Sequence, residues 1–86
     1  MGKATPHVVA TFYTTTAALA MQKAGVRHGL RGRLAPIPRQ LSAGCGFAWR
    51  EPAEGGAEVA SAAADAVRAV LEAEGIEAEG VVLLDL

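Results

Sequence analysis

A single cysteine, Cys45, is the residue of this 86-residue chain best suited to chemistry. It lies between Gly44 and Gly46, so the backbone can turn sharply there and another molecule can approach the sulfur closely. A free thiol is only about 3% ionised at pH 7, and half ionisation needs roughly 2 kcal/mol of stabilisation. The local sequence therefore favours a reactive cysteine, with an inert buried one as the alternative.

Three side chains near Cys45 have the chemistry to stabilise a sulfur anion. Arg39 and Arg50 flank it with positive charge, and the backbone N–H groups of a glycine-rich turn can form an anion-binding concavity. Ser42 can donate a hydrogen bond from its hydroxyl, although serine at such a position is also an ordinary turn or capping residue. We predict a catalytic group composed of Cys45, Arg39, Ser42 and Arg50.

Other kinds of site have little support in the sequence. His7 and His28 are far from Cys45 in the chain and show no CxxC or HxxxH spacing, so we expect no metal. No phosphate-loop, nucleophile-elbow or Rossmann motif is present, so we also expect no cofactor.

The formal charge of −1 conceals a marked asymmetry. Residues 1–50 carry seven basic side chains and no acidic ones, whereas residues 51–86 carry nine acidic side chains and one arginine, Arg68. The cysteine lies in the basic half, which suits an anion. The alternative is that the two halves attract each other within one small domain, with each surface ion pair contributing about 0–1 kcal/mol.

Cysteine usage and hydropathy indicate the cellular setting. One cysteine cannot form an internal disulfide, and residues 1–20 lack the charged start and apolar run of a signal peptide, so we expect a cytoplasmic protein. The apolar run 81–84 is far shorter than the roughly 20 residues of a membrane span, so we expect no membrane role.

Residue patterns predict four strands and two helices in one domain, residues 1–86. The strands are expected at 7–13, 31–36, 47–50 and 81–86, the last in the interior of a sheet because it is apolar almost throughout. The helices are expected at 17–28 and 57–74, each ending at a glycine followed by an aliphatic residue. Residues 51–56 are expected to form a turn. The order βαββαβ predicts an α+β ferredoxin-like sandwich, an antiparallel sheet with two helices on one face.

RNA-recognition modules share this element order, but binding of nucleic acid is not favoured. Such modules stack bases on aromatic side chains of the open sheet face, and the third strand offers only Phe47 and Trp49, which the core requires. The GxxG pattern of residues 29–32 leads from a helix into a strand, whereas the RNA-binding GxxG loop joins two helices.

The run from Pro36 to Arg50 resembles a family of small domains described as selenium/sulfur carrier protein-like. The similarity extends over nearly the whole chain. It includes a first strand ending near Phe12, a helix beginning at Ala18-Leu19, a helix end at Gly29-Leu30, and the elements Pro38-Arg39 and Ser42 to Gly46.

The resemblance implies a carrier in which Cys45 holds sulfur or selenium as a persulfide or perselenide. Its partners would be donor and acceptor proteins, bound weakly, and a homo-oligomer is compatible with this role. The competing hypothesis is a non-catalytic regulatory or assembly module that binds a small anion or pairs through its sheet edges, with Cys45 inert.

Overall fold

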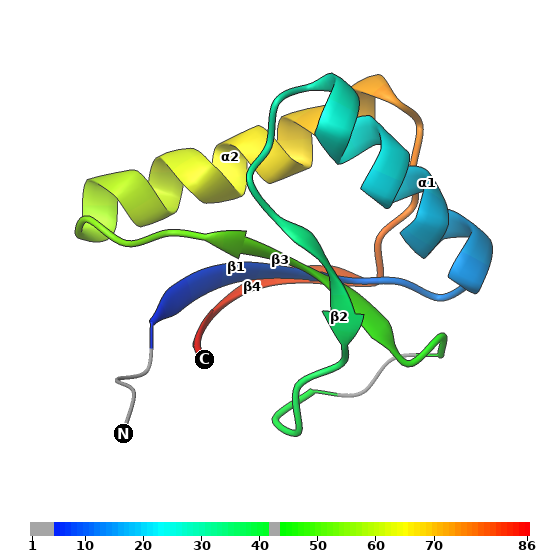
Figure 1. The fold of residues 1–86 in the computed structure, drawn as a ribbon, viewed down its shortest axis with the longest axis horizontal. Coiled ribbons are helices and arrows are strands. Elements are labelled where there is room, and N and C mark those ends of the chain that lie inside the picture. The colour runs from blue at the N-terminus through cyan, green and yellow to red at the C-terminus, as the bar shows by residue number, and fades with distance from the viewer. Residues whose placement is uncertain (1–4, 42–43) are drawn as a thin grey trace.

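The computed structural model describes residues 5–41 and 44–86, and within them it confirms the predicted element order βαββαβ. No helix in the described part of the chain is long and apolar enough to cross a membrane. The elements are β1 (Pro6–Thr11), α1 (Thr15–Arg27), β2 (Arg33–Pro36), β3 (Phe47–Pro52), α2 (Ala57–Ala73) and β4 (Gly80–Asp85), as Figure 1 shows.

The four strands form one antiparallel sheet in the order β2-β3-β1-β4. Both helices lie on the same side of this sheet, α1 over β2 and β3 and α2 over β1 and β4 (Figure 1). The prediction of a ferredoxin-like α+β fold is therefore confirmed. The prediction that the last strand lies inside the sheet is wrong, because among the described residues β4 pairs with β1 alone and forms an edge.

The core lies between the helices and the sheet, and Trp49 is its largest side chain. Trp49 pairs with Ala10 across β3 and β1, and its ring packs against Gly25 of α1. Gly25 thus serves packing, because a Cβ at this position would lie 2.8 Å from Trp49 Cζ2. Phe47, which the sequence assigned to the core, lies on the same face of β3 as Trp49 but is 45% exposed and contributes little to the core.

The ends of both helices follow the sequence expectation. Thr14 begins α1 by accepting a hydrogen bond from the N–H of Ala17. The residue after each terminal glycine folds back, since the N–H of Leu30 donates to Gly25 O and that of Ile76 donates to Leu71 O, both at 2.9 Å. These contacts fix the angle at which each chain segment leaves its helix.

The predicted turn 51–56 begins too early, because β3 continues to Pro52 and includes Glu51. Glu51 is only 6% exposed, yet its carboxylate is satisfied by three donors. Oε1 accepts from the N–H of Gly32 at 2.8 Å and from Trp49 Nε1 at 3.1 Å, and Oε2 accepts from the N–H of Arg31 at 3.0 Å. A glutamate that the local sequence places in a turn is therefore a buried anchor for the connection from α1 to β2.

The cysteine loop as candidate functional site

The connection between β2 and β3, residues 37–46, carries the cysteine and is called the cysteine loop. Two backbone hydrogen bonds shape its described part. The N–H of Ile37 donates to Gly46 O at 3.0 Å and closes the base of the loop, and the N–H of Leu41 donates to Pro38 O at 3.0 Å and forms a turn. Gly46 has φ +76°, a left-handed conformation that suits glycine and aims the chain into β3.

Cys45 is half-buried and packs against the edge of the hydrophobic core. Its thiol donates to the carbonyl oxygen of Phe47 at 3.3 Å, and the N–H of Phe47 donates to Sγ at 3.4 Å. Both contacts fasten the cysteine side chain to the backbone at the start of β3. One side of the side chain is thus held by the protein while the other remains open to solvent.

The residue before the cysteine seats the loop against the start of α1. A Cβ on Gly44 would lie 2.7 Å from the carbonyl oxygen of Tyr13, so only glycine allows the backbone to approach so closely. Tyr13 directly precedes Thr14, the N-cap of α1, and the first turn of this helix carries no acidic side chain. The positive end of the α1 dipole therefore lies next to the cysteine loop, where it favours anions.

The other predicted site residues are placed differently. Arg39 lies in the exposed turn of the cysteine loop. Arg50 is in register with Val9 and Arg33, on the sheet face opposite to Trp49 and the helices, and the structure does not bring it to Cys45. Ser42 lies outside the described residues.

An apolar hollow of about 170 Å³ lies beside the loop, between the first turns of α1 and the ends of β2 and β3. Phe47, which contacts Sγ through its backbone, forms one wall, and the exposed Leu19 forms another. The remaining lining residues are Thr15, Ala18, Leu34, Ala35 and Pro36. The sequence did not predict this hollow, because Phe47 was assigned to the core. The available signal was Pro36, which ends β2 and lines the hollow.

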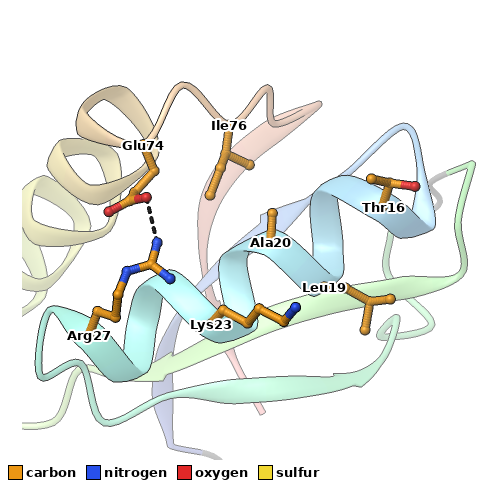
Figure 2. A pocket seen from close by; sticks show the side chains of 7 residues that line it. All are labelled: Thr16, Leu19, Ala20, Lys23, Arg27, Glu74 and Ile76. Carbon is orange, nitrogen blue, oxygen red and sulfur yellow. Dashed lines mark hydrogen bonds and ion pairs between the residues drawn. The ribbon is translucent and has the colours of Figure 1, made fainter.

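A second groove, of about 440 Å³, lies on the far side of Leu19, and Cys45 is not among its lining residues. Figure 2 shows its walls, α1 with Lys23 and Arg27 on one side and the end of α2 with Glu74 and Ile76 on the other. Leu19 lines both hollows, so the groove and the apolar hollow adjoin along α1. Along this side of α1, the apolar Leu19 and Ala20 are followed by the basic Lys23 and Arg27.

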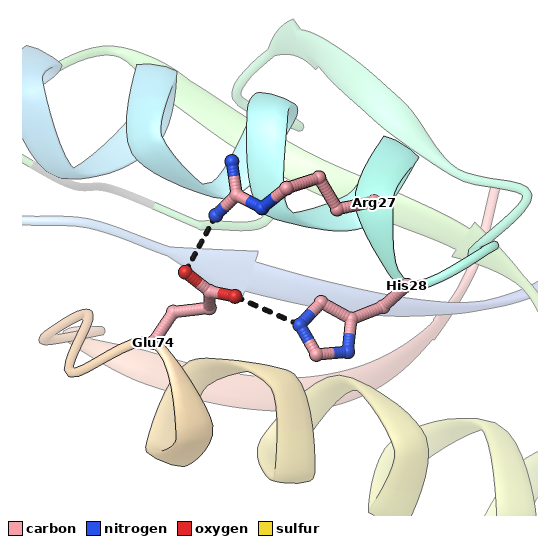
Figure 3. Close-up of polar contacts among 3 residues, drawn as sticks. All are labelled: Arg27, His28 and Glu74. Atoms are coloured by element: carbon pink, nitrogen blue, oxygen red, sulfur yellow. Dashed lines mark hydrogen bonds and ion pairs between the residues drawn. The ribbon is translucent and has the colours of Figure 1, made fainter.

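Arg27 and His28, at the end of α1, both contact Glu74 at the end of α2 (Figure 3). Arg27 Nη2 lies 2.5 Å from Glu74 Oε1, and His28 Nε2 lies 2.8 Å from Glu74 Oε2. The hydrogen bond with His28, followed by that from Arg27, keeps the pKa of Glu74 below its usual range. His28 therefore joins the two helices through its hydrogen bond with Glu74.

The histidines lie apart from the thiol. Nδ1 of His7 is 2.8 Å from the carbonyl oxygen of Thr5, and His28 is paired with Glu74. Among residues 5–41 and 44–86, no three histidine, cysteine, aspartate or glutamate side chains gather in a way that could hold a metal ion.

Comparison with known proteins gives one match. The family model described as "Putative Se/S carrier protein-like" matches residues 7–83, which include both helices, β2, β3, the cysteine loop and most of β1 and β4. Neither the curated proteins nor the solved structures include a match. Because the family model covers nearly the whole chain, this protein belongs to the Se/S carrier protein-like family.

Proposed function

We propose that this protein carries one sulfur or selenium atom on Cys45 and transfers it between two partner proteins. The observation that carries the proposal is the setting of the thiol, held by the backbone of Phe47 on one side and open to solvent on the other. Membership of the carrier-like family agrees with this role. A compartment that keeps thiols reduced, such as the cytoplasm, is the setting in which it would work.

Loading is a thiol exchange that needs no external oxidant. The Cys45 thiolate attacks the terminal sulfur of a donor persulfide, a new S–S bond forms to Sγ, and the donor S–S bond breaks with its thiolate as the leaving group. In delivery, an acceptor nucleophile attacks the terminal atom and the Cys45 thiolate leaves. Selenium follows the same course, with an S–Se bond formed and broken.

The surroundings of Cys45 support each stage of this exchange. The N–H of Phe47 and the N-terminus of α1 stabilise Sγ as the attacking and leaving anion. The glycines on either side leave room for a second sulfur atom and for the donor chain. The apolar hollow beside Phe47 is large enough to receive an aliphatic side chain of a partner.

The arginines are assigned separate tasks. Arg39, in the exposed turn of the cysteine loop, is proposed to attract the anionic donor and to neutralise the terminal persulfide. Arg50, on the open sheet face, is proposed to act on partner docking through its charge. Ser42 is proposed as a hydrogen-bond donor to the terminal atom.

The test is the intact mass of the reduced protein after incubation with a cysteine desulfurase and either cysteine or selenocysteine, from which the desulfurase forms the donor persulfide or perselenide. We expect wild type to gain one chalcogen atom that dithiothreitol removes, and Cys45→Ser to gain none. A parallel rate of alkylation near pH 6 reports thiolate availability, which we expect Arg39→Ala to lower more than Arg50→Ala.

Two results would contradict the carrier role. One is the absence of an adduct under conditions that load a known carrier protein. The other is an alkylation rate at Cys45 that becomes measurable only when the protein unfolds, which would leave the regulatory module as the better interpretation.

A further inference from the structure

The outer edge of β4 is the least protected surface of the sheet. Among the described residues, β4 pairs with β1 alone, and its sequence from Val81 to Leu84 contains no charge and no proline. Val82 is 40% exposed and Leu83 52% exposed. Edge strands of monomers normally carry lysine, proline or a bulge, because an open apolar edge pairs with other chains.

The pairing of β4 with β1 fixes which backbone groups point outward. Thr5 and Leu86 exchange both of their backbone hydrogen bonds, at 2.8 and 2.9 Å. Hydrogen-bonded and non-bonded pairs alternate along an antiparallel ladder, so Leu84 and Val82 also bond to β1. The N–H and C=O groups of Val81, Leu83 and Asp85 therefore face away from the sheet.

This pattern of outward groups is self-complementary. We propose that a second copy of this chain adds to the β4 edge in antiparallel orientation, with Leu83 opposite Leu83 of the other copy. Val81 then lies opposite Asp85 on both sides of the two-fold axis. These three pairs form about six new backbone hydrogen bonds and continue the sheet across both copies.

The same register covers the exposed apolar side chains. Leu83 separates two shallow grooves of about 290 and 310 Å³ between β4 and α2, and Ala60 contributes to both. The second Leu83 enters this space, and small residues of α2 along it, including Ser61 and Ala64, let the helix of the second copy come close. Val82 meets Leu84 of the other copy on the opposite face.

Charge complementarity distinguishes this register from its alternatives. Arg68 of α2 lines the groove beside Val81, and Asp85 lies at the other end of β4 on the same face. With Val81 opposite Asp85 of the other copy, each Arg68 faces an Asp85 across the interface. Arg68 lies 3.9 Å from Asp65 of its own helix, so Asp85 of the other copy competes with Asp65 for it, and the dimer is expected to be weak.

The experiment measures the mass of the reduced full chain by light scattering over a concentration series reaching about 1 mM, where even a millimolar dissociation constant is detected. Wild type, 8.8 kDa as a monomer, is expected to approach twice this mass. Leu83→Lys is expected to remain monomeric, whereas Val26→Lys, at an exposed apolar position of α1, is expected to behave as wild type. Circular dichroism checks that each variant is folded.

A charge exchange tests the register. Arg68→Asp and Asp85→Arg are each expected to weaken the dimer at least tenfold, and the double variant to recover most of the loss. Four results would overturn the proposal. Two concern the dimer itself: wild type stays monomeric, or the dimer survives Leu83→Lys. The other two concern the register: the double variant recovers nothing, or the particle keeps growing by head-to-tail pairing of β4 with β2. The proposed dimer does not depend on the carrier role, so Cys45→Ser should dimerise as wild type does.

Discussion

The two connections at the ends of β2 are built in opposite ways. The connection from α1, residues 28–32, is fastened by the backbone bond from Leu30 to Gly25 and by two N–H groups that donate to the buried carboxylate of Glu51. The cysteine loop, residues 37–46, shows only two backbone bonds among its described residues, both between its own members. Stability is thus concentrated at one end of β2, and access to the thiol at the other.

The difference follows from what each connection must do. The first connection runs beside Trp49 and Glu51, and the Glu51 carboxylate is only 6% exposed, so it needs protein donors in place of water. The cysteine loop must let a second protein reach Sγ, so few of its groups are committed to the core. Variants of the first connection should therefore change the free energy of unfolding, and variants of the second should change the chemistry of the thiol.

Glu51→Ala is expected to have the largest effect on stability. It leaves three N–H donors without an acceptor, at about 1–3 kcal/mol each, so the free energy of unfolding in urea should fall by about 3 kcal/mol or more. Glu51→Gln keeps Oε1 and turns an amide N–H₂ toward the N–H of Arg31, so a loss of about 1–3 kcal/mol is expected.

The matched control for both variants is Glu54→Gln, on an exposed residue three positions along the chain, which should stay within about 0.5 kcal/mol of wild type. The rate of Cys45 alkylation in the folded Glu51→Gln protein should equal that of wild type. A large change in this rate would show that the two ends of β2 are coupled and would break the comparison.

Gly25→Ala is expected to rank second. Alanine favours a helix by about 1 kcal/mol over glycine, but its Cβ would overlap the ring of Trp49, and overpacking of this kind costs about 1–3 kcal/mol. The net loss should be about 1–2 kcal/mol in urea unfolding. The smaller ring of Trp49→Phe should reduce the penalty of Gly25→Ala in a double-mutant cycle, whereas strict additivity would mean that the ring is not the cause.

Patterns of nearby residues predicted the features of the fold that depend on nearby residues alone. Element order and both helix ends follow from spacing and from glycine, because a C-cap is formed within six residues. Glu51 was misjudged because its N–H donors lie 19 and 20 residues earlier in the chain. The residues around Gly25 do not indicate its packing role, since its partner Trp49 is brought to it by the fold.

The candidate site and the last strand show a second limit. The sequence singled out Cys45 and its glycines, and it also suggested Arg50 because Arg50 is near Cys45 in the chain. Side chains alternate along β3, however, and the side chain of Arg50 lies on the sheet face opposite to Trp49. The apolar run of β4 indicated burial and was assigned to the sheet interior, while strand order, which depends on long-range pairing, made it an edge. Hydropathy alone cannot separate a strand buried within its own domain from one that binds another chain.

The ion pair at the first connection gives a smaller, pH-dependent effect. The pKa of Glu74 is lower in the folded chain than in the unfolded one, mainly through His28 and then Arg27, so the folded state binds fewer protons. The contribution of Glu74 to the free energy of unfolding is therefore complete above its pKa in the unfolded chain. It is lost as the pH falls through its pKa in the folded chain. Glu74→Gln should be less stable than wild type near pH 7 and equal to it near pH 2, as measured by urea unfolding. A difference that persists at low pH would assign the effect to packing.

Gly44→Ala is expected to change stability least and the thiol most. Its Cβ would meet the carbonyl oxygen of Tyr13, so the cysteine loop must move away from the start of α1. Because the loop is exposed and lightly bonded, the cost should stay below about 1 kcal/mol. Alkylation near pH 6 should slow, since Sγ loses the favourable field of the helix end.

Gly46→Asn is the control, because asparagine tolerates a left-handed φ and open space surrounds that position, so its alkylation rate should remain close to that of wild type. Equal rates in wild type and Gly44→Ala would mean that contact with the β1–α1 turn does not tune the thiol, and the separation between the two ends of β2 would rest on stability alone.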